Sequence, residues 1–143
     1  MKISTKGRYG LRVMIDLAIQ SREQGDKFIS LSEISSRQQI SVKYLEMIVG
    51  ILSKSGFVMS LRGKFGGYKL MNSPSEYTVG QILRVLEGDF APVECLECSP
   101  NRCPHADSCI TLPMWTGLYR LIDDYFDSIT LQDLIDKNEL PNT

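Results

Sequence analysis

The segment from residue 30 to residue 71 constrains the fold of this chain more than any other feature, because two short helical patterns there lead directly into a hairpin pattern. Ser30, with Glu33 three residues later, is typical of a helix N-terminus. Ser41 begins a second helix that we expect to run to Gly56, at the usual place of a left-handed C-terminal cap. Two short helices joined by a few residues are typical of a helix-turn-helix.

The hairpin pattern consists of two short, strand-like runs, 57–61 and 67–71, which flank a basic, glycine-rich turn. Such runs separated by glycines predict two antiparallel strands. A phosphate-binding loop is the alternative for the glycines, but such loops lead into a helix, whereas here a strand-like run follows. The order helix, helix, hairpin therefore predicts a winged helix-turn-helix domain.

Further helical patterns make the chain mostly α with one small β-hairpin. N-terminal caps and apolar spacing predict helices over about 5–21, 78–87, 113–129 and 130–136. In the first of them the residues expected to face the core are Leu11, Met14, Ile15 and Ala18, and Val13, Leu17 and Ile19 widen this stripe. We expect a winged helix-turn-helix DNA-binding domain over 1–75. Residues 76–143 then hold a cysteine loop (about 91–110) and a long dimerisation helix.

The helix predicted after Pro113 has a long apolar stripe. The stripe consists of Trp115, Leu118, Leu121, Ile122, Tyr125 and Phe126. It could pack inside its own chain or against a second copy. We favour the dimer, because two-fold pairing doubles the contacts that one small winged helix makes with DNA and sets the half-site spacing.

Charge is divided unevenly along the chain. Residues 1–70 contain twelve Lys/Arg and five Asp/Glu, a net charge of +7, whereas residues 71–143 contain four and twelve, a net charge of −8. A basic half joined to an acidic half indicates that the first part meets a polyanion, although a chance partition of surface charge is the alternative.

All four cysteines lie between Cys95 and Cys109, with Cys98 and Cys103 between them. The sequence has neither an N-terminal signal-peptide core nor an apolar run long enough for a membrane helix, so we expect a cytoplasmic protein with no membrane partner. Thiols stay reduced in that compartment, and a disulfide framework belongs mainly to small secreted domains. Clustered thiolates therefore favour one soft metal centre, either an iron–sulfur cluster or tetrahedral zinc.

Several segments, in this order, resemble the IscR/NsrR/CymR family of bacterial transcription regulators. The segments are 1–18, 40–58, 61–70 and 127–135, and the resemblance covers about residues 1–136. It implies a winged-helix domain and a homodimer on palindromic, double-stranded promoter DNA. In members that have cysteines it implies an iron–sulfur cluster that modulates DNA binding. Other members lack the cysteines and sense through a protein partner or a small molecule.

The cysteine spacing departs from that of the cluster-binding branch, which usually has three cysteines spaced C-x5-C-x5-C. Cys103 and Cys109 have this spacing, Cys98 is one residue too close to Cys103, and Cys95 is additional. The positions of the family's non-cysteine fourth ligands fall on Leu112 and Arg8, which cannot serve. We favour ligation by all four cysteines. Three cysteines with another group such as His105, and zinc or disulfide chemistry, stay open, as does the choice between 2Fe–2S and 4Fe–4S.

The expected DNA contacts come from the first helix, the recognition helix and the wing. They are Lys6, Arg8, Tyr9, Ser41, Lys43, Tyr44, Glu46, Arg62, Gly63, Lys64, Gly66 and Gly67. Glu46 could accept a hydrogen bond from a cytosine amine, while Arg62 and Lys64 could reach phosphates or a narrowed minor groove. For Tyr44 and Glu46 the alternatives are a packed ring and a merely solvated carboxylate.

Taken together, these patterns predict a DNA-binding transcription regulator, expected to be a repressor, whose promoter binding responds to an iron–sulfur cluster. A thiol-disulfide or zinc-dependent redox regulator is one alternative, and a cysteine-metabolism regulator controlled by a partner protein is another. An enzyme is not expected, because the single histidine lies inside the cysteine loop with no base and orienting group beside it. An electron-transfer protein would not need the basic hairpin.

Overall fold

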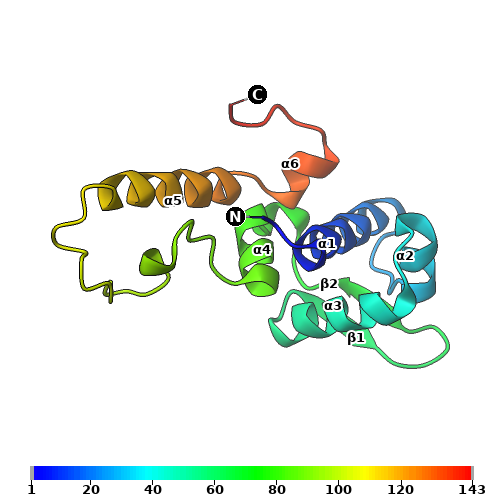
Figure 1. Ribbon diagram of the computed structural model, residues 1–143. Coiled ribbons are helices and arrows are strands. Elements are labelled where there is room, and N and C mark those ends of the chain that lie inside the picture. Colours follow the sequence, from blue (N-terminus) through cyan, green and yellow to red (C-terminus); the bar gives the residue numbers. More distant parts are fainter. Residues whose placement is uncertain (1, 143) are drawn as a thin grey trace.

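The computed structural model describes residues 2–142, and Figure 1 shows their arrangement. In chain order the elements are α1 (Thr5–Gln24), α2 (Leu31–Gln38), α3 (Val42–Lys54), β1 (Val58–Leu61), β2 (Gly67–Leu70), the 3-10 turn η1 (Pro74–Glu76), α4 (Val79–Glu87), the 3-10 turn η2 (Glu94–Leu96), α5 (Leu112–Asp127) and α6 (Leu131–Ile135). The predicted fold class, mostly helical with one small hairpin, is confirmed.

The helix starts follow the capping residues. The hydroxyl of Ser30 accepts a hydrogen bond from the amide of Glu33, and that of Ser41 from the amide of Tyr44, both at 3.2 Å. Gly56 has a φ of 75° just after α3, as the sequence predicts. Helix α1 ends at Gln24 rather than near Ser21, because the chain keeps its helical hydrogen bonds up to the turn at Gly25.

The main core forms around α1, which packs against both the helix-turn-helix and the C-terminal helices. Its buried face consists of Val13, Met14, Leu17 and Ala18. All four belong to the predicted stripe, of which Leu11, Ile15 and Ile19 are only partly buried. From α3 the same core receives Leu45, Ile48 and Leu52, each with no exposed surface.

The hairpin is tied to the segment that precedes α2. Strands β1 and β2 pair antiparallel from Val58 opposite Leu70 to Leu61 opposite Gly67. Ile29 and Tyr68 exchange two backbone hydrogen bonds of 2.8 Å, which hold the wing against the helix-turn-helix. Gly67 has a φ of 154°, and a Cβ there would lie 2.2 Å from the carbonyl oxygen of Ile29, so only glycine fits this contact.

Helices α4 and α6 continue the core beyond residue 75. Ile82 and Leu86 of α4 and Leu131 of α6 belong to the same buried cluster as Leu17. Leu86 lies so close to Gly10 of α1 that a Cβ on Gly10 would come within 2.0 Å of it. The boundary predicted near residue 75 stays a prediction about domains, but the hydrophobic core is continuous across it.

Helix α5 projects away from the rest of the molecule, with the cysteine loop at its far end (Figure 1). Its C-terminal half is fastened to α4, where Arg84 pairs with Asp123 at 3.0 Å and with Asp127 at 2.7 Å. The hydrogen bonds to Asp127 raise the pKa of Arg84 above its ordinary value, so this link keeps its charge at any physiological pH. No residue of α5 is fully buried.

Among the described residues, no helix has both the length and the apolar content needed to cross a membrane.

Candidate DNA-contacting surface and cysteine loop

The N-terminal turn of α3 is exposed where the sequence predicts DNA contacts. Ser41, Lys43 and Glu46 are exposed. Tyr44 is half-buried, and its ring meets that of Tyr9 edge to face, with 5.5 Å between ring centroids and 80° between planes. Both tyrosines therefore pack between α1 and α3, while part of each ring still faces solvent.

Two exposed apolar residues on α3 were not predicted as contacts. Val42 is 40% exposed and Met47 is 45% exposed. They lie off the buried line of Leu45 and Ile48, on the same side of the helix as Lys43 and Glu46 by helical spacing. Apolar groups at the start of a recognition helix suit thymine methyls. In the sequence, this role is indicated by the fact that neither Val42 nor Met47 falls in the apolar stripe that faces the core.

In the first turns of α1, some basic side chains point into solvent and others contact neighbouring residues. Arg8 is exposed and donates to the hydroxyl of Thr5 at 3.2 Å, whereas Lys6 is half-buried. Arg12 supports the surface from behind, because its guanidinium lies 5.2 Å from the ring centre of Tyr9 and donates to the Gln38 side chain at 3.1 Å.

A buried carboxylate joins α1 to α2. Asp16 is only 2% exposed and accepts two hydrogen bonds from the guanidinium of Arg37, at 2.8 and 3.0 Å. The amide of Gln38 donates to it at 3.0 Å. The hydrogen bonds to Asp16 raise the pKa of Arg37. This cluster therefore fastens the last turn of α2, which directly precedes α3, to α1. Sequence reasoning had no signal for it.

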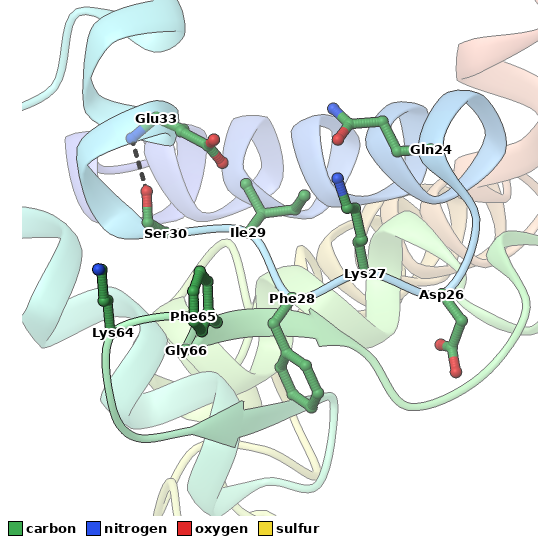
Figure 2. Close-up of a pocket in the computed structure, with 10 residues that line it drawn as sticks. All are labelled: Gln24, Asp26, Lys27, Phe28, Ile29, Ser30, Glu33, Lys64, Phe65 and Gly66. Atoms are coloured by element: carbon green, nitrogen blue, oxygen red, sulfur yellow. Dashed lines mark hydrogen bonds between the residues drawn. The ribbon is translucent and has the colours of Figure 1, made fainter.

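The wing turn is the most exposed part of the candidate DNA-contacting surface. Arg62, Gly63 and Lys64 are exposed, and Phe65 is 84% exposed. Figure 2 shows Lys64 and Phe65 opposite Ser30 and Glu33, across a pocket of about 450 Å³ between the wing and the start of α2. The Lys64 ammonium lies 5.7 Å from the Phe65 ring centre. Phe65 is a further candidate DNA contact. It was not predicted, because attention to the basic residues and glycines of the turn left its apolar residue aside.

Three of the four cysteines share one hollow in the loop. Cys95, Cys98 and Cys103 line a pocket of about 260 Å³ together with Glu94 and Arg102. All four cysteines are free thiols.

Cys109 and His105 are placed differently from the other candidate ligands. Neither is among the lining residues of the pocket. The Cys109 sulfur lies 3.4 Å from the Thr111 hydroxyl, and hydrogen bonding from that hydroxyl and from the Thr111 and Leu112 amides lowers the pKa of the Cys109 thiol. His105 is exposed.

The chemistry of these side chains fits an iron–sulfur cluster, although their present positions do not enclose one. Within residues 2–142, no group of three or more His, Cys, Asp or Glu side chains is close enough together to hold a metal ion. The expected metal centre is thus not preformed. Four thiols in one loop, three of them around one hollow, are a suitable donor set for such a cluster once the loop closes around it.

The apolar stripe of α5 is only partly covered within the described chain, where Ile122, Tyr125 and Phe126 pack partly against the small cluster around Phe90. Leu121 is 69% exposed and Leu118 is 39% exposed. A hollow of about 560 Å³ on this surface is lined by Ile3, Leu121, Ile122, Tyr125, Phe126 and Asn142. We call this surface the α5 face. Contiguous exposed apolar residues of this kind mark interaction sites.

The exposed recognition helix, the basic wing and the helix-turn-helix packing define a winged helix-turn-helix DNA-binding protein. The family model Rrf2, described as an iron-dependent transcriptional regulator, matches residues 3–137. The chain therefore belongs to the Rrf2 family of transcription regulators, which confirms the predicted resemblance. Its relatives are regulators and not enzymes, as the sequence predicts.

Individual relatives align over nearly the whole chain. The protein rrf2 of Nitratidesulfovibrio vulgaris is 38% identical, and the alignment covers 94% of this chain and 87% of that protein. The regulator CymR of Bacillus subtilis is 41% identical over 94% of this chain and 89% of its own length. The solved structure of CymR, described as the global cysteine regulator of B. subtilis, superposes with a TM-score of 0.77 at 40% identity, covering 97% of this chain and 99% of that one. The structure of T. potens IscR superposes with a TM-score of 0.74 at 37% identity, covering 97% and 89%.

Proposed function

We propose that this transcription regulator binds palindromic promoter DNA as a homodimer, as a repressor in the cytoplasm, and that an iron–sulfur cluster in the cysteine loop controls this binding. The observation that supports it most is the position of the thiols. Cys95, Cys98 and Cys103 surround one hollow in the segment that joins α4, which packs on α1, to α5 with its exposed apolar face. The family description as iron-dependent regulators agrees with this reading.

In the proposed complex, α3 enters the major groove by its N-terminal turn, and the wing follows the adjacent backbone or minor groove. The exposed Lys43 and Glu46 are placed to meet base edges, whereas Arg62 and Lys64 supply positive charge to the phosphates. Gly66 lets the hairpin turn tightly, because a Cβ there would lie 2.0 Å from the Leu61 carbonyl oxygen. The wing backbone can therefore approach DNA closely.

Replacing Arg62 by alanine is expected to weaken DNA binding about tenfold at low salt and to reduce the salt dependence of binding by about one charge. Arg62 is exposed on the wing, so the fold should tolerate the change. The measurement is a titration, at several salt concentrations, of a fluorescent duplex selected by the wild-type protein from random-sequence DNA. Arg120→Ala on α5 is the matched control. An unchanged salt dependence of binding for Arg62→Ala would count against contact between the wing and the DNA phosphates.

The cluster would use the thiols as ligands and would supply a centre that is sensitive to oxygen, nitric oxide and iron supply. Because the hollow is open in the structure, ligation draws the loop segments around Cys95, Cys98 and Cys103 together. The loop has no regular structure apart from η2, so this closure disturbs no long helix. If one thiol does not bind, the alternatives are Glu94, which lines the hollow, and His105, which follows Cys103 by two residues in the chain.

Iron and sulfide analysis of anaerobically purified protein tests the cluster directly. We expect coloured protein whose iron content falls by at least half in each of Cys95→Ser, Cys98→Ser and Cys103→Ser. Ligation by all four cysteines predicts the same loss in Cys109→Ser, whereas ligation by three predicts that this variant keeps its iron. Ser108→Ala is the control. Colourless, iron-free wild-type protein whose DNA binding still responds to thiol oxidation would refute the cluster.

That last outcome would favour a second candidate function, a thiol-based or partner-controlled regulator of cysteine metabolism. The similarity to CymR, described as the global cysteine regulator of B. subtilis, supports this second candidate. The comparisons therefore fit the two candidate functions equally. The four thiols are free, and hydrogen bonding lowers the pKa of Cys109, which favours its reactive thiolate form. Mass spectrometry of protein treated with a mild oxidant would then show a disulfide within the loop.

A further inference from the structure

The last turn of α4 holds the first turn of α1. One carboxylate oxygen of Glu87 accepts hydrogen bonds from the backbone amide of Ser4 at 2.9 Å and from that of Gly7 at 3.1 Å. The Ser4 hydroxyl donates to the same oxygen. Amides at a helix N-terminus lack intrahelical partners, and a negative charge there is favourable, so Glu87 acts as a cap supplied by a different helix.

The Glu87 carboxylate approaches the backbone of α1 closely. A Cβ on Gly7 would lie 2.2 Å from the Glu87 carboxylate oxygen, so α1 can bring its backbone this close only because residue 7 is glycine. Lys6 and Arg8, two predicted phosphate contacts, lie on either side of Gly7 in the same turn. Glu87 therefore caps the same turn of α1 that contains these two cations.

The residues that follow Glu87 contact α5 and the start of the cysteine loop. Gly88 has a φ of 85° and ends α4. Asp89 accepts a hydrogen bond from the Tyr119 hydroxyl of α5 at 2.7 Å and another from the amide of Ala91 at the start of the cysteine loop. Phe90 packs on Phe126 of α5, with 5.1 Å between ring centroids. We call residues 87–89 the junction.

We propose that Glu87 is a positioning residue that transmits the state of the cysteine loop to the DNA-contacting turn of α1. A loop that closes or opens pulls on Ala91 and Asp89, Gly88 swivels, and the Glu87 carboxylate shifts relative to the amides of Ser4 and Gly7. The inference rests on the proposed function, because it requires two loop states with different DNA affinity. The inference adds the physical connection between the cysteine loop and the DNA-contacting turn of α1.

The test compares dissociation constants for the selected duplex between anaerobic, cluster-loaded protein and the same protein after chelation of iron. We expect these two constants to differ about tenfold or more in the wild type, within the usual range of allosteric coupling. In Glu87→Ala the ratio should fall to within about twofold of one. Glu87→Gln keeps an acceptor oxygen and should retain most of the wild-type ratio.

Gln81→Ala is the matched control, because it weakens α4 at the opposite end. Gln81 closes the capping box with Thr78 at 3.0 and 3.1 Å. A merely structural role for Glu87 would lower affinity in both states and leave the ratio intact, as we expect for Gln81→Ala. A wild-type ratio in Glu87→Ala overturns the proposal.

Amide hydrogen exchange over residues 4–8 gives a readout without DNA. Removal of the cluster should change exchange there in the wild type and leave it unchanged in Glu87→Ala. Suppose that wild-type protein loads a cluster, but that its removal changes neither the dissociation constant for DNA nor the amide exchange over residues 4–8. This result would refute both the role of the junction and control of DNA binding by the cluster. A wild-type DNA ratio without the exchange change would refute the junction alone.

Discussion

Replacing Leu121 by arginine is expected to give a folded monomer that binds the selected duplex about 100-fold more weakly than the wild type, or weaker still. Leu121 is 69% exposed on the α5 face, so the single chain loses little packing from the change. In a dimer the guanidinium would be buried against apolar side chains without a partner, which is costly. Loss of the second DNA-binding domain removes an avidity gain of about 10²–10⁴.

Sedimentation equilibrium measures the oligomeric state, and the DNA titration measures affinity. Met71→Arg is the matched control, because Met71 is also exposed (45%) but lies just after β2, away from α5. We expect that control to stay dimeric. If Leu121→Arg also stays dimeric, the α5 face is not the interface. If it is monomeric with undiminished affinity, the dimer is not needed for DNA binding.

Replacing Asp16 by alanine is expected to lower the free energy of unfolding by about 3 kcal/mol. The carboxylate is 2% exposed and holds Arg37 and Gln38 through three hydrogen bonds of 2.8 to 3.0 Å. Its removal leaves the guanidinium and the amide without an acceptor between α1 and α2. Because Arg37 keeps 35% of its side-chain surface in water, we expect the lower end of the range for broken buried pairs.

Urea denaturation measures this difference, and Asp26→Ala provides a close control. Asp26 also makes an ion pair at 2.8 Å, with Lys69, but its side chain is 87% exposed. Exposed pairs contribute little, so we expect a change of about 0.5 kcal/mol or less. Equal effects of the two substitutions would show that burial of Asp16 does not determine its contribution.

Much of the local structure could be predicted from the sequence. Ser41 and Gly56 mark the ends of the recognition helix because caps act through hydrogen bonds within a few residues. The hairpin follows from its glycines, and Gly67 is required where the wing touches Ile29. The apolar stripe of α5 was also visible, although the stripe alone could not show that the helix projects from the molecule with its face only partly covered.

How deeply each residue of the α1 stripe is buried was not predictable, because that depends on how many helices surround it. The sequence pattern puts Leu11 and Ile15 in the main stripe and Val13 and Leu17 in its widening, yet Val13 and Leu17 are the more deeply buried residues, since α3, α4 and α6 all pack around this helix. Tyr9 and Tyr44 were expected to contact DNA, and the structure shows that they also pack against each other.

The sequence by itself determined the class of the protein, the presence of four thiols in one loop and the basic character of residues 1–70. Each depends on residue type and short-range spacing. The tertiary structure alone decided that Cys95, Cys98 and Cys103 share a hollow without Cys109, and that Glu87 caps a helix whose Gly7 is 80 residues away in the chain. Contacts over such separations depend on how whole helices pack, and side-chain patterns within one segment contain no record of that geometry.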